Sequence, residues 1–508
     1  MSDPSAATRP RGLLVLLVLL VTGVSPYFGR FMNANERPRL LQGMAWVDEG
    51  SHAIDGPSAR GIAAGIDVSQ TPQGRLVPNK PPGTTVVAAG AYGSARFVRG
   101  DDLTLGEYTA WARLLGGAIP MALVLWLGAV RLRGRGVTFA LVAYALATPA
   151  LAYARLLYGH QLAAALLFAG VVLLDRAVTK RSIPLGAFAG ALAGAAVGVE
   201  YLAAFAGLPI GMWLLWDASR TRRAALMFAA LAGALVPVAL LAGYHDAVFG
   251  SPWTTPYHAV VREGFAEIHG RGLLGLTWPT STSLFEHLVS PWGGLLYWAP
   301  LSVLAVAASI RAVAARKASA FEVLSLGIVV WMMLLNVCLA QTGGWRVGPR
   351  YLVVALPFLL PGLARLWSGM RHAVAGSLVV ALLGWSMFVN FLAAGLFPHL
   401  VPEGNPLMDL LLPLWSEGLR PHAPWGRWAL DACGVGTLVA FVIATRPRTD
   451  AARTSWVLGV VGACVLVGAG MLVPGAPAAE DSLAAIRGIW EPGGTRPPKD
   501  RVLGGLQE

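Results

Sequence analysis

Long apolar runs recur along most of this sequence and constrain its fold more than any other feature. A helix needs about 20 predominantly apolar residues to cross the hydrocarbon core of a bilayer. Only 13% of the residues are charged and 56% are hydrophobic, whereas soluble domains carry about 25% charged residues. The sequence therefore predicts an all-α polytopic membrane protein, with about thirteen transmembrane helices near residues 12–28, 110–130, 137–154, 160–174, 184–200, 202–216, 224–243, 293–310, 321–340, 351–367, 373–395, 427–445 and 455–473.

The basic residues indicate how these spans are oriented. Lys and Arg in short loops stay on the cytoplasmic side of a membrane. In this chain they occupy the N-terminus and every second connection, as Arg131/Arg133/Arg135, Arg176/Lys180/Arg181, Arg220/Arg222/Arg223, Arg311/Arg316/Lys317, Arg365/Arg371 and Arg446/Arg448/Arg453. We therefore expect a cytoplasmic N-terminus, and we expect the long segments 29–106, 244–292 and 396–426 and the C-terminal tail 474–508 to lie outside.

Residues 1–473 are expected to form one transmembrane unit, because the apolar runs leave no room for a separate soluble core. The net charge of +12 is spread in small groups between the apolar runs. This distribution favours anionic membrane lipid over nucleic acid as the partner of the basic residues.

The first outer loop, residues 29–106, holds the densest collection of polar groups and is the candidate site. Apolar residues at helical spacing over 39–47 predict an amphipathic helix at the membrane interface, with Asn35 and Glu36 at its start. Further along, Asn79-Lys80-Pro81-Pro82-Gly83 places an ammonium group at the lipid boundary, where it can meet a lipid phosphate. Two simpler interpretations stay open: Glu36 forms an ion pair with Arg37 or Arg39, and Lys80 extends to the head groups without a specific ligand.

These loop motifs resemble those of a known superfamily. Asn35-Glu36-(x)2-Arg39 followed by Asn79-Lys80-Pro81-Pro82-Gly83 resembles the first outer loop of GT-C glycosyltransferases, and bacterial lipid A aminoarabinose transferases and protein O-mannosyltransferases are the most similar groups. The strings 343–352 (Gly-Gly-Trp-Arg-Val-Gly-Pro-Arg-Tyr-Leu) and 290–297 (Ser-Pro-Trp-Gly-Gly-Leu-Leu-Tyr) resemble later outer-loop elements of bacterial members. The similarity covers roughly residues 12–370.

The resemblance implies a GT-C-like fold and a function. A member of this group transfers a sugar from a polyprenyl-phosphate donor to a lipid, glycan or protein acceptor at the outer face of the cytoplasmic membrane of a bacterium. The first residue of the family's acidic pair is Asn35 in this chain, and an amide cannot accept the proton. Either Glu36 takes that role, or Asp48, Asp55 or Asp67 reaches the site, or the activity is lost.

Inverting sugar transfer needs a carboxylate to accept the acceptor's proton and cations to stabilise the departing phosphate. We expect Glu36 as the base or the acceptor-orienting carboxylate, and Lys80 and Arg350 on the donor phosphate. Arg346 or His160 is expected to assist, and His160 could instead accept a proton. No cofactor is indicated with certainty; a divalent metal ion on Asp55 and Asp67 is an alternative, although the sequence contains no compact ligand motif.

Two other classes of function remain open. A transporter or flippase of lipid-linked sugars would also have many spans, but its polar residues are expected at the membrane midplane, whereas this chain concentrates them in outer loops. A non-catalytic scaffold descended from a transferase would explain Asn35. Glu200 lies between two nearly continuous apolar runs and is not among the residues expected in the site.

Overall fold

The structure is a computed structural model that describes residues 11–23, 34–221, 224–270, 275–340, 344–370, 372–398, 404–416, 428–447 and 450–471. The predicted tail 474–508 lies outside the described residues. So do the N-terminal ten residues and four of the basic residues used for the orientation, Arg222, Arg223, Arg371 and Arg448.

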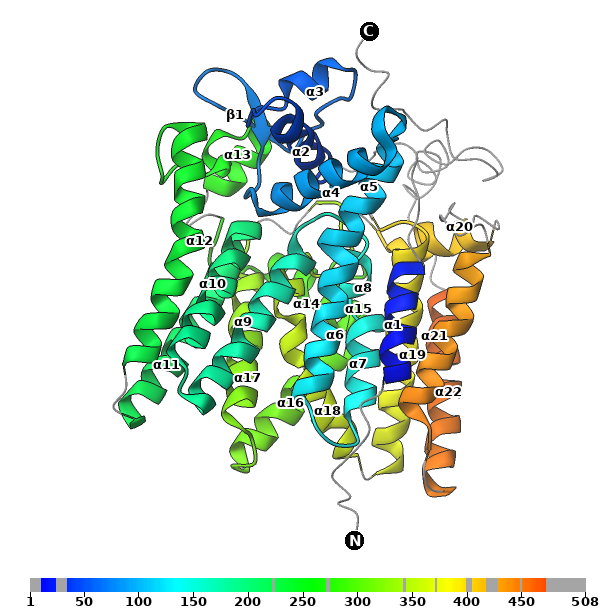
Figure 1. The fold of residues 1–508 in the computed structure, drawn as a ribbon. Coiled ribbons are helices and arrows are strands. Elements are labelled where there is room, and N and C mark those ends of the chain that lie inside the picture. Colours follow the sequence, from blue (N-terminus) through cyan, green and yellow to red (C-terminus); the bar gives the residue numbers. More distant parts are fainter. Residues whose placement is uncertain are drawn as a thin grey trace.

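The described chain is a bundle of long helices with a small layer of short elements on one end (Figure 1). Seven helices are long and apolar enough to cross a membrane: α5–η2–α6 (Leu105–Arg131), α9 (His160–Lys180), η3–α11 (Tyr201–Thr221), α12 (Ala225–Phe249), α17 (Ala320–Val337), η5–α18 (Arg350–Ser368) and α19 (Ala373–Gly395).

Shorter apolar helices complete the bundle. They include α1 (Arg11–Gly23), α7 (Val137–Leu146), α10 (Ile183–Val199), α16 (Leu301–Ala314), α21 (Ala429–Thr445) and α22 (Asp450–Met471). Each of the thirteen predicted spans overlaps a described helix. The all-α polytopic membrane fold is therefore confirmed, and the number of membrane crossings stays a prediction.

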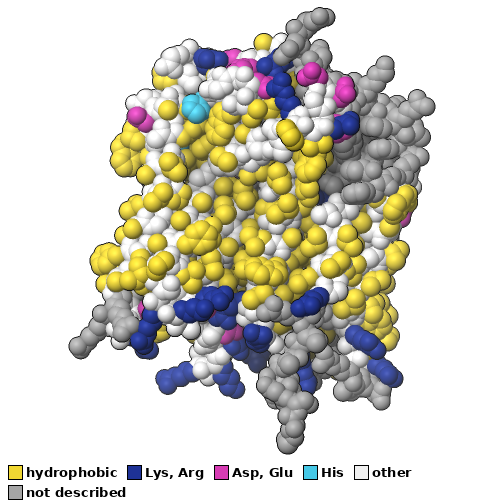
Figure 2. Space-filling view, viewed as in Figure 1, with side chains coloured by type: hydrophobic (Ala, Val, Ile, Leu, Met, Phe, Trp, Pro, Cys, Tyr) yellow, Lys and Arg dark blue, Asp and Glu magenta, His cyan; other side chains and the backbone are white. Residues whose placement is uncertain are grey.

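The two ends of the bundle differ in charge. Lys and Arg side chains gather along the lower rim, below a broad hydrophobic band, whereas acidic and basic side chains are mixed above that band (Figure 2). On the lower end, which we call the basic face, Arg131 pairs with Asp175 at 2.9 Å and Arg365 with Glu322 at 2.6 Å. We call the opposite end, which carries residues 34–104, the loop face.

Residues 34–104 form a compact layer on the loop face, which we call the cap. It contains α2 (Arg37–Asp48), α3 (Asp55–Ala59), an antiparallel hairpin of β1 (Val68–Gln70) and β2 (Leu76–Pro78), α4 (Gly83–Arg99) and η1 (Gly100–Asp102). The helix predicted over 39–47 is present as α2. It packs against α4 and is buried from Pro38 to Ala45, so it is more enclosed than a helix lying free at an interface.

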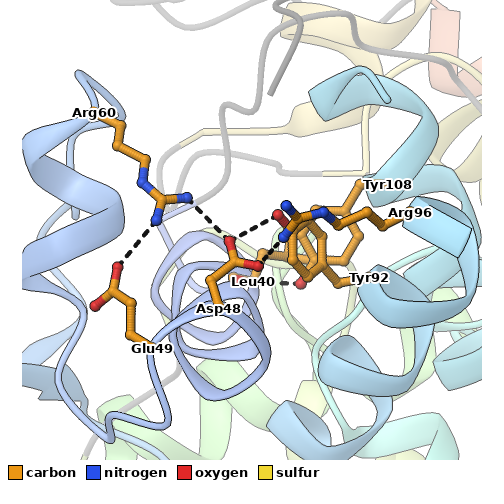
Figure 3. A network of polar contacts seen from close by, with 7 residues as sticks. All are labelled: Leu40, Asp48, Glu49, Arg60, Tyr92, Arg96 and Tyr108. Carbon is orange, nitrogen blue, oxygen red and sulfur yellow. Dashed lines mark hydrogen bonds and ion pairs between the residues drawn. The ribbon is translucent and has the colours of Figure 1, made fainter. Parts of the chain in front are cut away.

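Asp48, at the end of α2, holds the cap together (Figure 3). Its carboxylate accepts hydrogen bonds from Arg60 at 3.0 Å and from the hydroxyl of Tyr92 at 2.9 Å, and it also pairs with Arg96. Tyr92 and Arg96 belong to α4, whereas Arg60 follows α3. Asp48 was considered as a possible site residue, but its contacts are those of a structural group that joins three segments of the cap.

We expect Asp48→Asn to lower the free energy of unfolding by about 1–3 kcal/mol, because hydrogen bonds to a charged group contribute about that much. The measurement is the thermal midpoint of the detergent-solubilised chain. Asp101→Asn is the matched control, since Asp101 is exposed in η1 and the described residues show no ion pair to it. An equal midpoint for both variants would contradict the structural role of Asp48.

Candidate functional site

The candidate site lies where the cap meets the loop-face ends of α9, α10 and η5. Charged and polar side chains from these elements lie within hydrogen-bonding or electrostatic range of one another. They form what we call the charged cluster: Asn35, Arg39, Asp67, Lys80, His160, Glu200 and Arg350. Five of the seven were predicted from the sequence as site residues. Arg39 was part of the motif, and Glu200 was not expected there.

Asn35 connects the first cation of the cluster to its first carboxylate. Its amide oxygen accepts a hydrogen bond from Arg39, and its amide nitrogen donates to Asp67 Oδ2 at 3.3 Å. A carboxylate in place of Asn35 could accept the hydrogen bond from Arg39, but its negative charge would repel the carboxylate of Asp67. The amide of Asn35 therefore allows Asp67 to lie next to it.

Close packing of the turn after β2 brings Lys80 to the end of α10. A Cβ atom on Gly83 would overlap the backbone of Gly198 and the side chain of Val199, so only glycine lets the two backbones approach this closely. On the other side, the backbone nitrogen of Asn79 donates a hydrogen bond to the backbone oxygen of Asp67 at 3.1 Å. The turn that carries Lys80 is therefore held between Asp67 on one side and the end of α10, next to Glu200, on the other.

Lys80 is half-buried and lies against an aromatic side chain. Its ammonium lies 3.5 Å from the hydroxyl of Tyr257 and 4.8 Å from the centre of that ring. Burial lowers the pKa of Lys80 to about 8, and Arg350 adds to this shift. Asp67 and Glu200 oppose it. Lys80 therefore carries its charge at neutral pH but loses it far more readily than an exposed lysine does.

His160 and Glu200 form the inner part of the cluster. The imidazole Nδ1 of His160, the first residue of α9, lies 3.1 Å from Glu200 Oε2, and both side chains are buried. Glu200 follows the last residue of α10 and precedes η3. The sequence signal for Glu200 was a carboxylate between two apolar runs, since such groups are seldom kept without a function.

Two buried arginines extend the cluster along the loop face. Arg350 donates to the hydroxyl of Tyr351 at 2.9 Å, and its Nε has no hydrogen-bond partner among the described residues. Arg346 lies in electrostatic range of Arg350 and 4.0 Å above the ring of Trp292. A reciprocal pair of hydrogen bonds between Tyr153 and the backbone of Val347 anchors this segment.

Glu36 is placed differently from the expectation that it faces the site. Its carboxylate is fully buried and accepts two hydrogen bonds from Arg113 of α5, at 3.0 and 2.7 Å. It accepts a third hydrogen bond from the backbone nitrogen of Leu157 at 2.5 Å. Glu36 therefore forms an ion pair, as the simpler interpretation expects, but its partner is Arg113 and not Arg37 or Arg39.

Asp55 and Asp67 lie at opposite ends of the β1–β2 hairpin. Asp55 accepts from the backbone nitrogen of Leu76 at 3.2 Å and pairs with Arg75 at 3.6 Å, near the hairpin turn. Asp67 lies at the open end, beside Asn79. The two carboxylates expected to share a divalent metal ion are thus separated. Among the residues that the structure describes, no three His, Cys, Asp or Glu side chains gather in a possible metal site.

The charged cluster and its extension carry a surplus of positive charge. Four cationic side chains, namely Arg39, Lys80, Arg346 and Arg350, stand against three carboxylates, those of Asp67, Glu200 and Glu286. Burying a cation without a partner is costly. The arrangement is therefore incomplete without an anion, and it is suited to bind one next to a carboxylate.

We expect Glu36→Gln to destabilise the fold by about 3–5 kcal/mol, because it leaves the buried guanidinium of Arg113 without its counter-charge. The double variant Glu36→Gln/Arg113→Gln should recover part of this loss, since removing both charges leaves neither unpaired. Thermal midpoints in detergent measure both effects. A Glu36→Gln variant with a wild-type midpoint and no activity would contradict the structural assignment and favour Glu36 as a catalytic base.

No protein-family model matches the sequence, and no curated protein sequence matches it. Among solved structures, the chain is similar to ArnT from Cupriavidus metallidurans in the apo state, with 16% identity over 90% of this chain and 78% of that chain and a TM-score of 0.47. It is also similar to arabinosyltransferase EmbB from Mycobacterium smegmatis, with 18% identity over 95% of this chain and 41% of that chain and a TM-score of 0.48.

A third similar structure is the oligosaccharyltransferase of Archaeoglobus fulgidus, with 12% identity over 98% of this chain and 60% of that chain and a TM-score of 0.40. The residues of the candidate site are assigned from the contacts of this chain alone.

Proposed function

We propose that this protein transfers a sugar from a polyprenyl-phosphate donor to an acceptor hydroxyl at the loop face of the membrane. The observation that carries the proposal is the buried surplus of positive charge beside Asp67. The basic residues on the opposite face favour an outward orientation of the loop face, and we place the protein in the cytoplasmic membrane of a bacterium.

In the proposed reaction, the oxygen of the acceptor hydroxyl attacks the anomeric carbon of the donor sugar, and the bond from that carbon to the phosphate oxygen breaks. Asp67 takes the hydroxyl proton, and polyprenyl phosphate departs with its negative charge. Lys80 and Arg350 stabilise that charge, which is the contribution expected of preorganised cations. Attack from the side opposite the phosphate would invert the anomeric configuration.

The remaining residues of the charged cluster position these groups. Asn35 holds Asp67 by its amide nitrogen and Arg39 by its amide oxygen. Glu200 pairs with His160 and lies in electrostatic range of Lys80, so it keeps the ammonium in place. The acceptor, which can be a lipid, a glycan or a protein, must present its hydroxyl next to Asp67.

The test is sugar transfer by the purified chain in lipid, with a panel of radiolabelled polyprenyl-phosphate sugars and membrane-extracted acceptors. We expect Asp67→Asn to reduce transfer by about 10²–10⁴-fold, the range typical for loss of a general base. Asp55→Asn, at the other end of the same hairpin, is the matched control and should retain activity. Equal losses in the two variants would contradict the role of Asp67. Donor binding without turnover in the wild type would favour a flippase or a scaffold.

The lowered pKa of Lys80 predicts a pH dependence of donor binding. Below pH 8 the ammonium is charged and binds phosphate, and above pH 8 it is neutral, so affinity falls as the pH rises. Between pH 7 and pH 9 we expect about a tenfold loss of affinity for polyprenyl phosphate. Lys80→Arg should lack this dependence, because a guanidinium stays charged in this range. A wild-type affinity that is constant up to pH 9 would contradict the prediction.

A further inference from the structure

Arg346 is the most unusual buried group on the loop face. Its side chain is fully buried, and none of its three guanidinium nitrogens has a hydrogen-bond partner among the described residues. The guanidinium lies 4.0 Å above the ring of Trp292. It also occupies the space that a Cβ atom on Gly293 would fill. The absence of a side chain at Gly293 leaves room for this guanidinium, but no described residue accepts a hydrogen bond from it.

No described neighbour neutralises Arg346. Arg350 lies in electrostatic range and has the same charge. Glu286 is a carboxylate in that range, but its effect on the pKa of Arg346 is smaller than that of Arg350. The described residues show no ion pair between Glu286 and Arg346. The hydroxyls of Tyr153 and Tyr351 are the other groups that influence the pKa of Arg346, and both raise it. Burial lowers the pKa of Arg346 to about 10, so it is still charged at neutral pH.

Further hydrogen-bond donors lie near this guanidinium. The indole nitrogen of Trp292 is buried and has no partner among the described residues. His287 of α14 (Ser281–Leu288) is buried close by. Burial, together with the charge of Arg346, lowers the pKa of His287 to about 3, and a hydrogen bond to the backbone of Leu339 opposes this shift, so the imidazole is neutral and Leu339 accepts from it. Buried donors without partners are rare and need an explanation.

We propose that Arg346 and the indole nitrogen of Trp292 form a second oxyanion site, distinct from the one at Lys80, which binds a phosphate or carboxylate group of the acceptor. Arg350 is in electrostatic range of both Lys80 and Arg346, so it stands between the two sites. A planar guanidinium binds two oxygens of one oxyanion at once. Assigning the second anion to the acceptor rests on the proposed function, but the binding of an oxyanion at Arg346 does not.

The experiment compares Arg346→Gln with the matched control Arg365→Gln, in a Lys80→Ala background that weakens the first site by removing its ammonium. The chain is solubilised in a maltoside detergent, which contains no phosphate. Thermal midpoints are measured without added oxyanion and in titrations with inorganic phosphate or D-glucuronate. The two oxyanions distinguish a phosphate-bearing from a carboxylate-bearing ligand.

We expect at least one of the two oxyanions to raise the midpoint of the Lys80→Ala chain. Arg346→Gln should weaken that binding by about tenfold or more, as expected when hydrogen bonds to a charged group are lost. Without oxyanion, Arg346→Gln should raise the midpoint, because it removes an uncompensated buried charge. Arg365→Gln should lower the midpoint, since it breaks the pair with Glu322, and should leave oxyanion binding intact.

Oxyanion binding that is absent from the Lys80→Ala chain, or that is unchanged by Arg346→Gln, would overturn the second site. The outcome is separable from a failure of the proposed function. If the wild type transfers no sugar but oxyanion binding still depends on Arg346, then the site stands and the reaction is wrong.

Discussion

The buried ion pair between Glu36 and Arg113 is the interaction on which the loop face depends. It joins the start of α2 in the cap to α5 at the top of a long helix. Both atoms of the Leu157 backbone take part in the same junction: its nitrogen donates to Glu36, and its oxygen accepts from Arg39. Two buried charges and the backbone of Leu157 therefore hold the cap in place on the bundle.

The position of the charged cluster follows from that junction. Once α2 is fixed at Glu36, the positions of Asn35 and Arg39 follow, and the two side chains, one helical turn apart, are hydrogen-bonded to each other. The hairpin then brings Asp67 to Asn35, and the turn after β2 packs on the end of α10. The cap thus acts as a scaffold that presents a carboxylate and several cations to the membrane boundary.

The charged residues on the loop face are of two kinds: some have partners and stabilise the fold, and others lack partners and can bind a ligand. Glu36 and Asp48 have partners for their charges and hold the cap in place. All three guanidinium nitrogens of Arg346 and the Nε of Arg350 have no hydrogen-bond partner among the described residues. Natural structures seldom bury donors in this way without a ligand, so the unsatisfied cations mark the part of the fold that is built for binding.

The sequence predicts the fold better than it predicts the site, and the reason is physical. Apolar length and the distribution of Lys and Arg are local properties, and the described helices confirm the all-α polytopic membrane fold. Lys80, His160 and Arg350 are expected in the site because each belongs to an outer-loop segment that resembles those of GT-C glycosyltransferases, and their role stays a prediction. The partner of Glu36 could not be predicted, since Arg113 lies 77 residues further along the chain and only the packing of α2 on α5 brings them together.

The same limit applies to the carboxylates. Asp55 and Asp67 are alike in sequence, and only the hairpin register separates them, with Asp67 at the open end and Asp55 near the turn. Glu200 was visible as a carboxylate between apolar runs, but its contact with His160 depends on the packing of α9 against α10.

The most direct test of the central claim is an experimental structure of the chain in lipid with polyprenyl phosphate bound. The account predicts the phosphate group at the loop face, in contact with the ammonium of Lys80 and the guanidinium of Arg350, with Asp67 nearby. A phosphate group bound at the basic face, or on the loop face away from both Lys80 and Arg350, would contradict it.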